Sequence, residues 1–379
     1  MKKKLNLIPT AFMAIAILMN PASAHERQPE EKAKVQLAIL LDTSNSMDGL
    51  IKQAKTQLWS IVNTFGEAKR GGQEAFVEVA LYEYGNSALD AESYYIRKVL
   101  PFTRDLDEVS DQLFELKTNG GDEYCGAVIR RAAEQLQWDD SPRTYRAMFI
   151  AGNEPFNQGP IDPGSACREA MERSIFVNTI HCGNESVGEN TGWKSGALVT
   201  GGDFSVIDQN KVVAVIKCPQ DAIIIQLNEE LNQTYLKFGT RGEEGALKQR
   251  RQDGNSKLSR EGQINRVVTK ATQNYTNSLW DLVDASKDES FKLEEVAVEH
   301  LPKELQMLTQ KERADKVAEM AAKRAKIQQQ IKKLNAEREV FLAAERKKQG
   351  EDTGGTLGAE VRKAVSQQAA SLGYDLSAR

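Results

Sequence analysis

The stretch that decides the fold is VQLAILLDTSNS, residues 35–46. Its first seven residues form an almost continuous apolar run, which is typical of a central strand in a parallel sheet covered on both faces. The run ends at Asp42, and a short polar loop then leads into a segment with apolar residues at helical spacing. The stretch therefore predicts a buried strand, a polar loop at its carboxyl end and a helix that covers the sheet.

Strand-like and helix-like segments continue to alternate along the next part of the chain. Further strands are expected at residues 76–84, 93–102, 147–151, 175–181 and 204–208, and helices at residues 106–116, 128–136 and 166–173. Such alternation favours a doubly wound, mostly parallel α/β sheet flanked by helices. We therefore expect a Rossmann-like α/β domain over residues 33–213, with its site in the loops that follow the strands.

The second half of the sequence predicts a mainly α-helical C-terminal region. Residues 214–300 have helical apolar patterns, interrupted by a strongly polar stretch at residues 239–262 that is typical of a hinge or exposed linker. Residues 301–349 are rich in charged residues and helix formers, which predicts one long helix. Residues 350–379 begin with several glycines, so we expect a flexible tail with a short helix.

The long helix carries a pattern close to a coiled-coil seam. Ile327 and Ile331 lie at seam positions, which suggests self-association, but Arg324 and Arg338 fall on the same stripe and interrupt it. A hairpin against the segment around Trp280 is one alternative, and a solvated surface helix is another.

The first 24 residues have the pattern of an export signal. Three lysines at residues 2–4 precede a largely apolar segment at residues 5–18, and Ala22-Ser23-Ala24 offers small residues to a signal peptidase. The mature chain is then expected to begin at His25 and to contain no integral membrane segment, because no later apolar run is long enough. We expect a periplasmic protein, with release outside the cell as the alternative.

The composition argues against two classes of function. The chain has 379 residues and a net charge of −4, with acidic and basic residues mixed along it, so capture of nucleic acid is not expected. Three histidines and four cysteines leave little material for a dedicated zinc site.

The loop after the first strand is the strongest candidate site. Asp42, Ser44 and Ser46 place one carboxylate and two hydroxyls at alternate positions. Such hard oxygen ligands favour Mg²⁺, Mn²⁺ or Ca²⁺ over zinc. Helix capping is the alternative, because the same side chains accept hydrogen bonds from exposed amides. The position at the end of a central strand favours a cation site.

With this Asp-x-Ser-x-Ser pattern and the α/β alternation around it, the sequence resembles the von Willebrand factor type A (vWA) family. The pattern is that of the family's metal ion-dependent adhesion site. The resemblance implies a divalent cation, with Mg²⁺ preferred, whose open coordination position accepts an acidic group from a protein partner. In the family a second loop adds a Thr or an acidic ligand, and a third loop adds an Asp in a Thr-Asp-Gly turn.

The resemblance also assigns candidate ligands in these two loops. In the second loop Asp122 is the preferred ligand and Thr118 the alternative. In the third loop Gly152 stands at the expected acidic position, so the site departs from the family pattern. Asn153 or Glu154 would then compensate, directly or through water.

The cysteines are considered for both disulfides and catalysis. An exported chain meets an oxidising compartment, and Cys167 and Cys182, the nearest pair in sequence, are the candidate disulfide. Other pairings and four reduced thiols remain open. A thiol-dependent enzyme or redox protein would use Cys125 or Cys182, but no local pattern supplies a thiolate, a base and an orienting group together.

The leading interpretation is an exported, non-catalytic binding or adhesion module that engages a protein partner through a divalent cation. One alternative is a metal-independent envelope scaffold that acts through its long C-terminal helix. The other is a thiol-dependent enzyme or redox protein.

Overall fold

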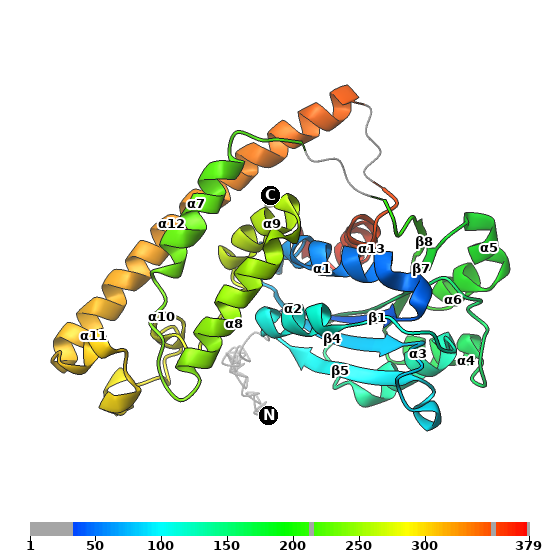
Figure 1. The fold of residues 1–379 in the computed structure, drawn as a ribbon, viewed down its shortest axis with the longest axis horizontal. Helices are drawn as coiled ribbons and strands as arrows, with labels where there is room; N and C mark the ends of the chain where they lie inside the picture. The colour runs from blue at the N-terminus through cyan, green and yellow to red at the C-terminus, as the bar shows by residue number, and fades with distance from the viewer. Residues whose placement is uncertain (1–32, 212–215, 350–353, 377–379) are drawn as a thin grey trace, which may run out of the picture. The chain divides into compact units, whose positions relative to one another are not determined.

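The computed structural model describes residues 33–211, 216–349 and 354–376 (Figure 1). The expected export signal at residues 1–24, and the expected mature start at His25, lie outside the described residues. Within the described ranges, none of the helices combines the length and the apolar character needed to cross a bilayer.

A six-stranded sheet organises the first domain. Its strands are β1 (Lys34–Asp42), β4 (Phe76–Tyr84), β5 (Ile96–Thr103), β6 (Tyr145–Gly152), β7 (Phe176–Cys182) and β8 (Phe204–Ile207). They lie in the order β5-β4-β1-β6-β7-β8, and every neighbouring pair is parallel except β4 and β5. The expected doubly wound, mostly parallel α/β fold is confirmed.

Helices cover both faces of this sheet. The helices of the domain are α1 (Asp48–Asn63), α2 (Leu106–Glu115), α3 (Cys125–Gln135), α4 (Pro163–Glu172), α5 (Glu185–Asn190), α6 (Trp193–Val199) and α13 (Leu357–Ser371), with short 3₁₀ turns η1 (Asn45–Met47) and η2 (Ala91–Ser93). Leu37, Ile39 and Leu41 of β1 pack in one core cluster with α1, α2 and α13. Ala38 and Leu40 pack in a second cluster with α3, α4 and α6. This two-sided burial explains why the β1 sequence is continuously apolar.

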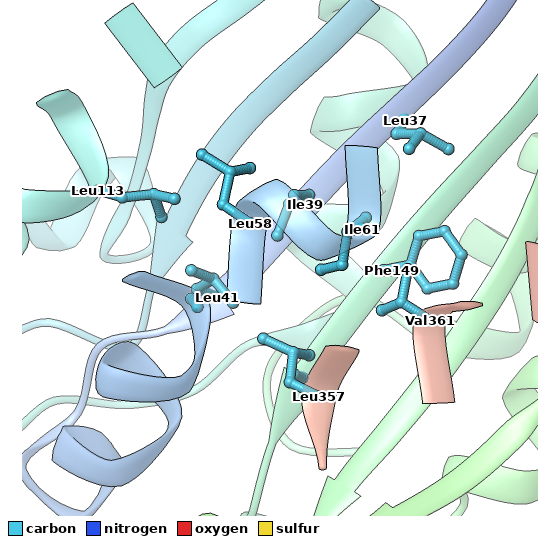
Figure 2. A pocket seen from close by; sticks show the side chains of 11 residues that line it. Leu37, Ile39, Leu41, Leu58, Ile61, Leu113, Phe149, Leu357 and Val361 are labelled. Atoms are coloured by element: carbon cyan, nitrogen blue, oxygen red, sulfur yellow. The ribbon is translucent and has the colours of Figure 1, made fainter. Parts of the chain in front are cut away.

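The last helix, α13, belongs to the core of the first domain. Leu357 and Val361 are buried, and Figure 2 shows them facing the sheet together with Ile61 of α1 around a cavity of about 10 Å³. Residues 350–379 are expected from the sequence to be a flexible tail with a short helix. The described part of this segment instead closes the sheet, because the apolar face of its helix packs against α1.

The segment after α13 adds a strand to a small second sheet. Its strands are β2 (Lys69–Arg70), β3 (Gln73–Glu74) and β9 (Tyr374–Asp375). β9 pairs antiparallel with β2, and the Tyr374 hydroxyl lies 2.6 Å from the carbonyl oxygen of Lys34. The C-terminal strand is thus joined to the beginning of the domain.

Between β8 and α13 the chain forms a helical region. Its elements are α7 (Asp221–Asn232), α8 (Gly242–Asn255), η3 (Ser256–Leu258), α9 (Arg260–Lys270), α10 (Leu282–Ala285), η4 (Leu293–Glu295), η5 (Val298–His300), α11 (Lys303–Gln306) and α12 (Gln310–Gln349). The 40-residue helix α12 packs against α7, α9 and α10. Ile327 and Ile331 lie in a buried cluster with Ile224 and Ile264, so this part of the seam-like stripe is covered within the chain.

The two arginines that interrupt the stripe are buried in ion pairs. Arg324 lies 2.7 Å from Asp281 and 3.0 Å from Asp284. Arg338 lies 2.9 Å from Asp221. Burying an unpaired charge is costly, so these pairs explain how charged side chains fit inside a helix bundle.

The polar stretch at residues 239–262 is a helix rather than a linker. α8 forms there, and Lys248 lies 3.3 Å from Asp105 beside α2. A Cβ atom at Gly245 would lie 2.4 Å from the Trp280 ring. The segment is polar because it pairs with acidic groups of α2, and a glycine is needed where it approaches Trp280.

Arg266 joins the helical region to the first domain. Its side chain is fully buried, 2.7 Å from Asp107 of α2 and 2.5 Å from Asp253 of α8. The guanidinium group also lies over the Trp59 ring of α1, 4.6 Å from the ring centroid. The helical region is therefore anchored to α1 and α2 through buried polar contacts.

Candidate cation site

The loops at the carboxyl edge of the sheet meet where β1 ends. β1 lies between β4 and β6 and runs parallel to both, so Asp42 lies near the ends of these two strands. The loop between α2 and α3 is tied to the same place, since the backbone amide of Asn119 donates a hydrogen bond to the Thr43 carbonyl (2.9 Å). The site is thus assembled from three loops, as expected for an α/β sheet.

The Asp42 side chain is fully buried, but only one of its two carboxylate oxygens accepts a hydrogen bond from a described residue. Its Oδ1 accepts a hydrogen bond from the backbone amide of Ser44 (2.8 Å). Its Oδ2 is buried and has no hydrogen-bond partner among the described residues. The Ser44 side chain makes no capping hydrogen bond to the helical turn that follows. Helix capping therefore does not account for this loop, and it leaves the buried Oδ2 of Asp42 unsatisfied.

The hydroxyls and an amide oxygen lie next to the carboxylate. The Ser44 and Ser46 hydroxyl oxygens are 3.3 Å apart. The Ser46 hydroxyl donates to Oδ1 of Asn153, again at 3.3 Å. The structure thereby brings together Asp42, Ser44, Ser46 and Asn153, as expected from the sequence.

Glu123 is a carboxylate beside Asp42 that the sequence analysis did not single out. Glu123 is buried, and it lies close enough to Asp42 and Glu154 for their charges to act on its carboxylate. Burial, aided by the charges of Asp42 and Glu154, raises the pKa of Glu123 to about 7, against a lowering by the Ser44 hydroxyl, which donates to it. The pKa of Asp42 also rises to about 7, mainly through burial, with a smaller contribution from Glu154. Burial and neighbouring negative charge both disfavour the charged form of a carboxyl group, which explains the two raised pKa values.

Asp122, the preferred ligand of the second loop, and Thr118, its alternative, both make contacts away from Asp42. The Asp122 carboxylate is exposed and accepts a hydrogen bond from the Tyr124 hydroxyl (3.0 Å). The Thr118 hydroxyl donates to Asp48 at the start of α1 (2.5 Å). Neither contact includes Asp42, so the loop presents Glu123 to it instead.

Comparison with known proteins identifies the domain. The family profile "von Willebrand factor type A domain" matches residues 36–191. These residues form a vWA domain. No curated protein sequence matches the chain.

The chain is also similar, at low sequence identity, to several solved structures. BatB from Bacteroides thetaiotaomicron has 17% identity and a TM-score of 0.36, over 46% of this chain and 90% of that chain. The SpRpn10 vWA domain has 14% identity and a TM-score of 0.35, over 47% and 98%. Proximal thread matrix protein 1 from the mussel byssus, with a zinc-occupied adhesion motif, has 12% identity and a TM-score of 0.36, over 48% and 43%.

The third loop of this vWA domain lacks space for an acidic residue. A Cβ atom at Gly152 would lie 2.5 Å from the Tyr84 hydroxyl oxygen and 3.0 Å from Oδ2 of Asp42. The Tyr84 hydroxyl is held there because it donates to the Ala151 carbonyl (3.0 Å). Tyr84 and Gly152 therefore replace the acidic residue of the family pattern as a matched pair.

The chemistry of the remaining oxygens fits a hard divalent cation. No group of three or more His, Cys, Asp or Glu side chains forms a metal-binding cluster within residues 33–211, 216–349 and 354–376. Hard divalent cations, however, also take neutral oxygen ligands such as amide carbonyls beside carboxylates. The unpartnered Oδ2 of Asp42, the two serine hydroxyls and the raised pKa of Glu123 together form a donor set that a cation would stabilise.

The cysteines of the chain are free and buried. Cys167 and Cys182, the candidate disulfide, belong to core clusters on opposite faces of the sheet, which keeps the two thiols apart. Burial raises the pKa of Cys167 to about 12 and the pKa values of Cys125 and Cys182 further still. Thiols in this state are protonated at neutral pH and are poor nucleophiles.

Proposed function

We propose that this protein is a non-catalytic binding module that engages a protein partner through a divalent cation held by its vWA domain. The observation that carries the proposal is the fully buried Asp42 carboxylate, whose Oδ2 has no partner in the described residues although it lies among oxygen ligands. Leaving such a group unsatisfied is costly, and a bound cation removes the cost.

Asp42, Ser44 and Ser46 would hold the cation, with Glu123 assisting and Asn153 and Glu154 contributing directly or through water. Oxygen ligands of this kind favour Mg²⁺, with Mn²⁺ and Ca²⁺ as alternatives. When bound, the cation supplies an attachment point for a carboxylate of the partner. The affinity of the protein for its partner would then depend on the presence of the cation.

A binding role agrees with the absence of a reactive thiol among the described residues. Cys125 and Cys182, the candidates for thiol chemistry, are buried, and burial raises their pKa values. The neighbouring His181 is also buried. A substrate would have no access to these groups.

We further propose that the protein is exported and acts in the periplasm or outside the cell. The basic and apolar pattern of residues 2–18 and the small residues at 22–24 support this proposal. N-terminal sequencing of the protein from an envelope fraction should yield a chain that begins at His25. Recovery of the intact N-terminus from the cytoplasm would contradict it.

The cation step is tested by calorimetric titration of the chain from His25 with Mg²⁺ and Mn²⁺. We expect saturable binding that Asp42→Ala reduces by at least about tenfold. Asp315→Asn, a change on the exposed face of α12, is the matched control and should leave the isotherm unchanged. Equal binding by the wild type and the Asp42 variant would place the metal elsewhere.

A further inference from the structure

An open groove of about 430 Å³ lies next to the candidate cation site. It is bounded by α1, by the loop after α2 and by η3 of the helical region. The residues that line it are Asp48, Ile51, Lys52, Lys55, Leu116, Lys117, Thr118 and Leu258. The hydrogen bond from Thr118 to Asp48 belongs to this lining, and the same loop is tied to the residue after Asp42 through the Asn119 amide.

The groove has a basic rim. Lys52, Lys55 and Lys117 line it together with a single acidic residue, Asp48. None of the three lysines lies within salt-bridge distance of an acidic side chain in the described parts of the chain, although Asp48 acts on Lys55, whose pKa burial lowers and the charge of Asp48 raises. The chain as a whole is acidic, with a net charge of −4, so this local excess of positive charge runs against its overall balance.

Cations on the neighbouring helix α8 are treated differently. Lys248 pairs with Asp105, and Arg251 pairs with Asp111. Both of these basic side chains of α8 are therefore neutralised by acidic residues of the first domain. The groove lysines form no salt bridge with these acidic residues. Charges that a protein leaves unpaired around a concave surface attract ligands of opposite sign.

The groove also has an apolar component. Ile51 and Leu116 are buried at its base, whereas Leu258 is 54% exposed at its edge. Lys55 is partly buried, and its ammonium group donates to the Leu116 carbonyl (3.3 Å), so its stem covers part of the base. An inorganic anion would leave Leu258 uncovered, whereas a peptide with an apolar side chain would bury it.

We infer that this groove binds an acidic, extended segment of the protein partner that carries at least one apolar side chain. The inference rests on the proposed function, since the groove would receive the residues that flank the carboxylate at the cation. The lysines supply long-range attraction and orientation, and Leu258 with the base of the groove supplies a contact for the apolar side chain.

The test uses a fluorescent peptide in which one leucine is flanked by two glutamates on each side, and the chain from His25 in low-salt buffer with Mg²⁺. We expect binding that weakens as salt is added, because the attraction is screened. The double variant Lys52→Glu/Lys117→Glu should lower the affinity by at least about tenfold, and the exposed-helix control Lys326→Glu should change it by less than about twofold. Lys55 is left unchanged because it supports the loop backbone.

Parallel titrations in EDTA separate this inference from the proposed function. Binding that survives EDTA but is lost in the double variant supports the groove and contradicts the cation step. Binding that is lost in EDTA but unaffected by the double variant supports the cation step and overturns the groove. The inference is also overturned if the wild type does not bind the peptide, if a glutamine version binds equally well, or if inorganic phosphate competes as strongly as the peptide.

Discussion

The hydroxyl oxygen of Tyr84 lies 2.5 Å from the position that a Cβ atom would take at Gly152. Tyr84 is the last residue of β4 and Gly152 the last residue of β6, the two strands that flank β1. The tyrosine side chain fits there because residue 152 has no side chain. The departure from the vWA family pattern is therefore part of the packing of the site.

This pairing predicts the effect of adding a side chain at residue 152. Gly152→Ala should lower the free energy of unfolding by about 1–3 kcal/mol through overpacking. Tyr84→Phe removes the hydroxyl, so Gly152→Ala should cost less in that background. Urea denaturation of the four proteins of this double-mutant cycle measures the coupling. Gly254→Ala, with open space around its Cβ position, is the control; an equal loss of stability in both backgrounds would refute the pairing.

Glu123 and Asp122 provide a second test, because they are adjacent in sequence but differ in environment. We expect Glu123→Gln to weaken Mg²⁺ binding by about 10–100-fold, as the loss of a supporting carboxylate does in other metal sites. Asp122→Asn should change the affinity by no more than about twofold, since its carboxylate contacts Tyr124. Calorimetric titration measures both; the reverse order would restore Asp122 as the ligand.

The role of α13 can be tested with a single truncation of a side chain. Leu357 is buried next to the cavity in Figure 2, so Leu357→Ala should lower the free energy of unfolding by about 2–5 kcal/mol. Leu279 is 67% exposed, and Leu279→Ala should change it by no more than about 0.5 kcal/mol. Chemical denaturation compares the two variants; similar small losses would mean that α13 adds little to the core.

Lys270 predicts a pH dependence of stability. Burial lowers its pKa from 10.5 to about 8, although Asp253 opposes the shift. Between pH 8 and 10.5 the unfolded chain keeps a proton that the folded chain has lost, so the contribution of Lys270 to stability rises with pH across this window. Relative to Lys270→Met, the wild type should gain up to about 3 kcal/mol over this range. Unfolding at several pH values, with Lys326→Met as the surface control, measures the difference; a constant offset would exclude the shift.

The sequence predicted the sheet well because its strands carry strong local signals. The apolar run before Asp42 is readable without knowledge of the fold, since both faces of β1 are buried. Asp42, Ser44 and Ser46 could be predicted as site residues because they lie at the end of that strand and directly after it.

Other features depend on contacts that a local pattern does not specify. Asp122 and Glu123 lie in a loop, where a shift of one residue decides which carboxylate points inward, and no periodicity marks the difference. The sequence predicted a short helix in the last segment but not its packing, because its partner, α1, lies about 300 residues away, as the hydrogen bond from Gly358 to Gln57 shows. Arg324 stood out in the sequence only as an interruption of the seam-like stripe, and Arg266 did not stand out, because the fold alone brings their acidic partners to them.

The position of α13 also has a consequence for biosynthesis. The ribosome makes the strands of the first domain before the helical region, and the helix that seals one of its faces after it. Until then Leu37, Ile39 and Leu41 lack part of their cover. A nascent chain would therefore carry an incomplete first domain until the helical region has been made, and premature termination within that region would leave the first domain without α13.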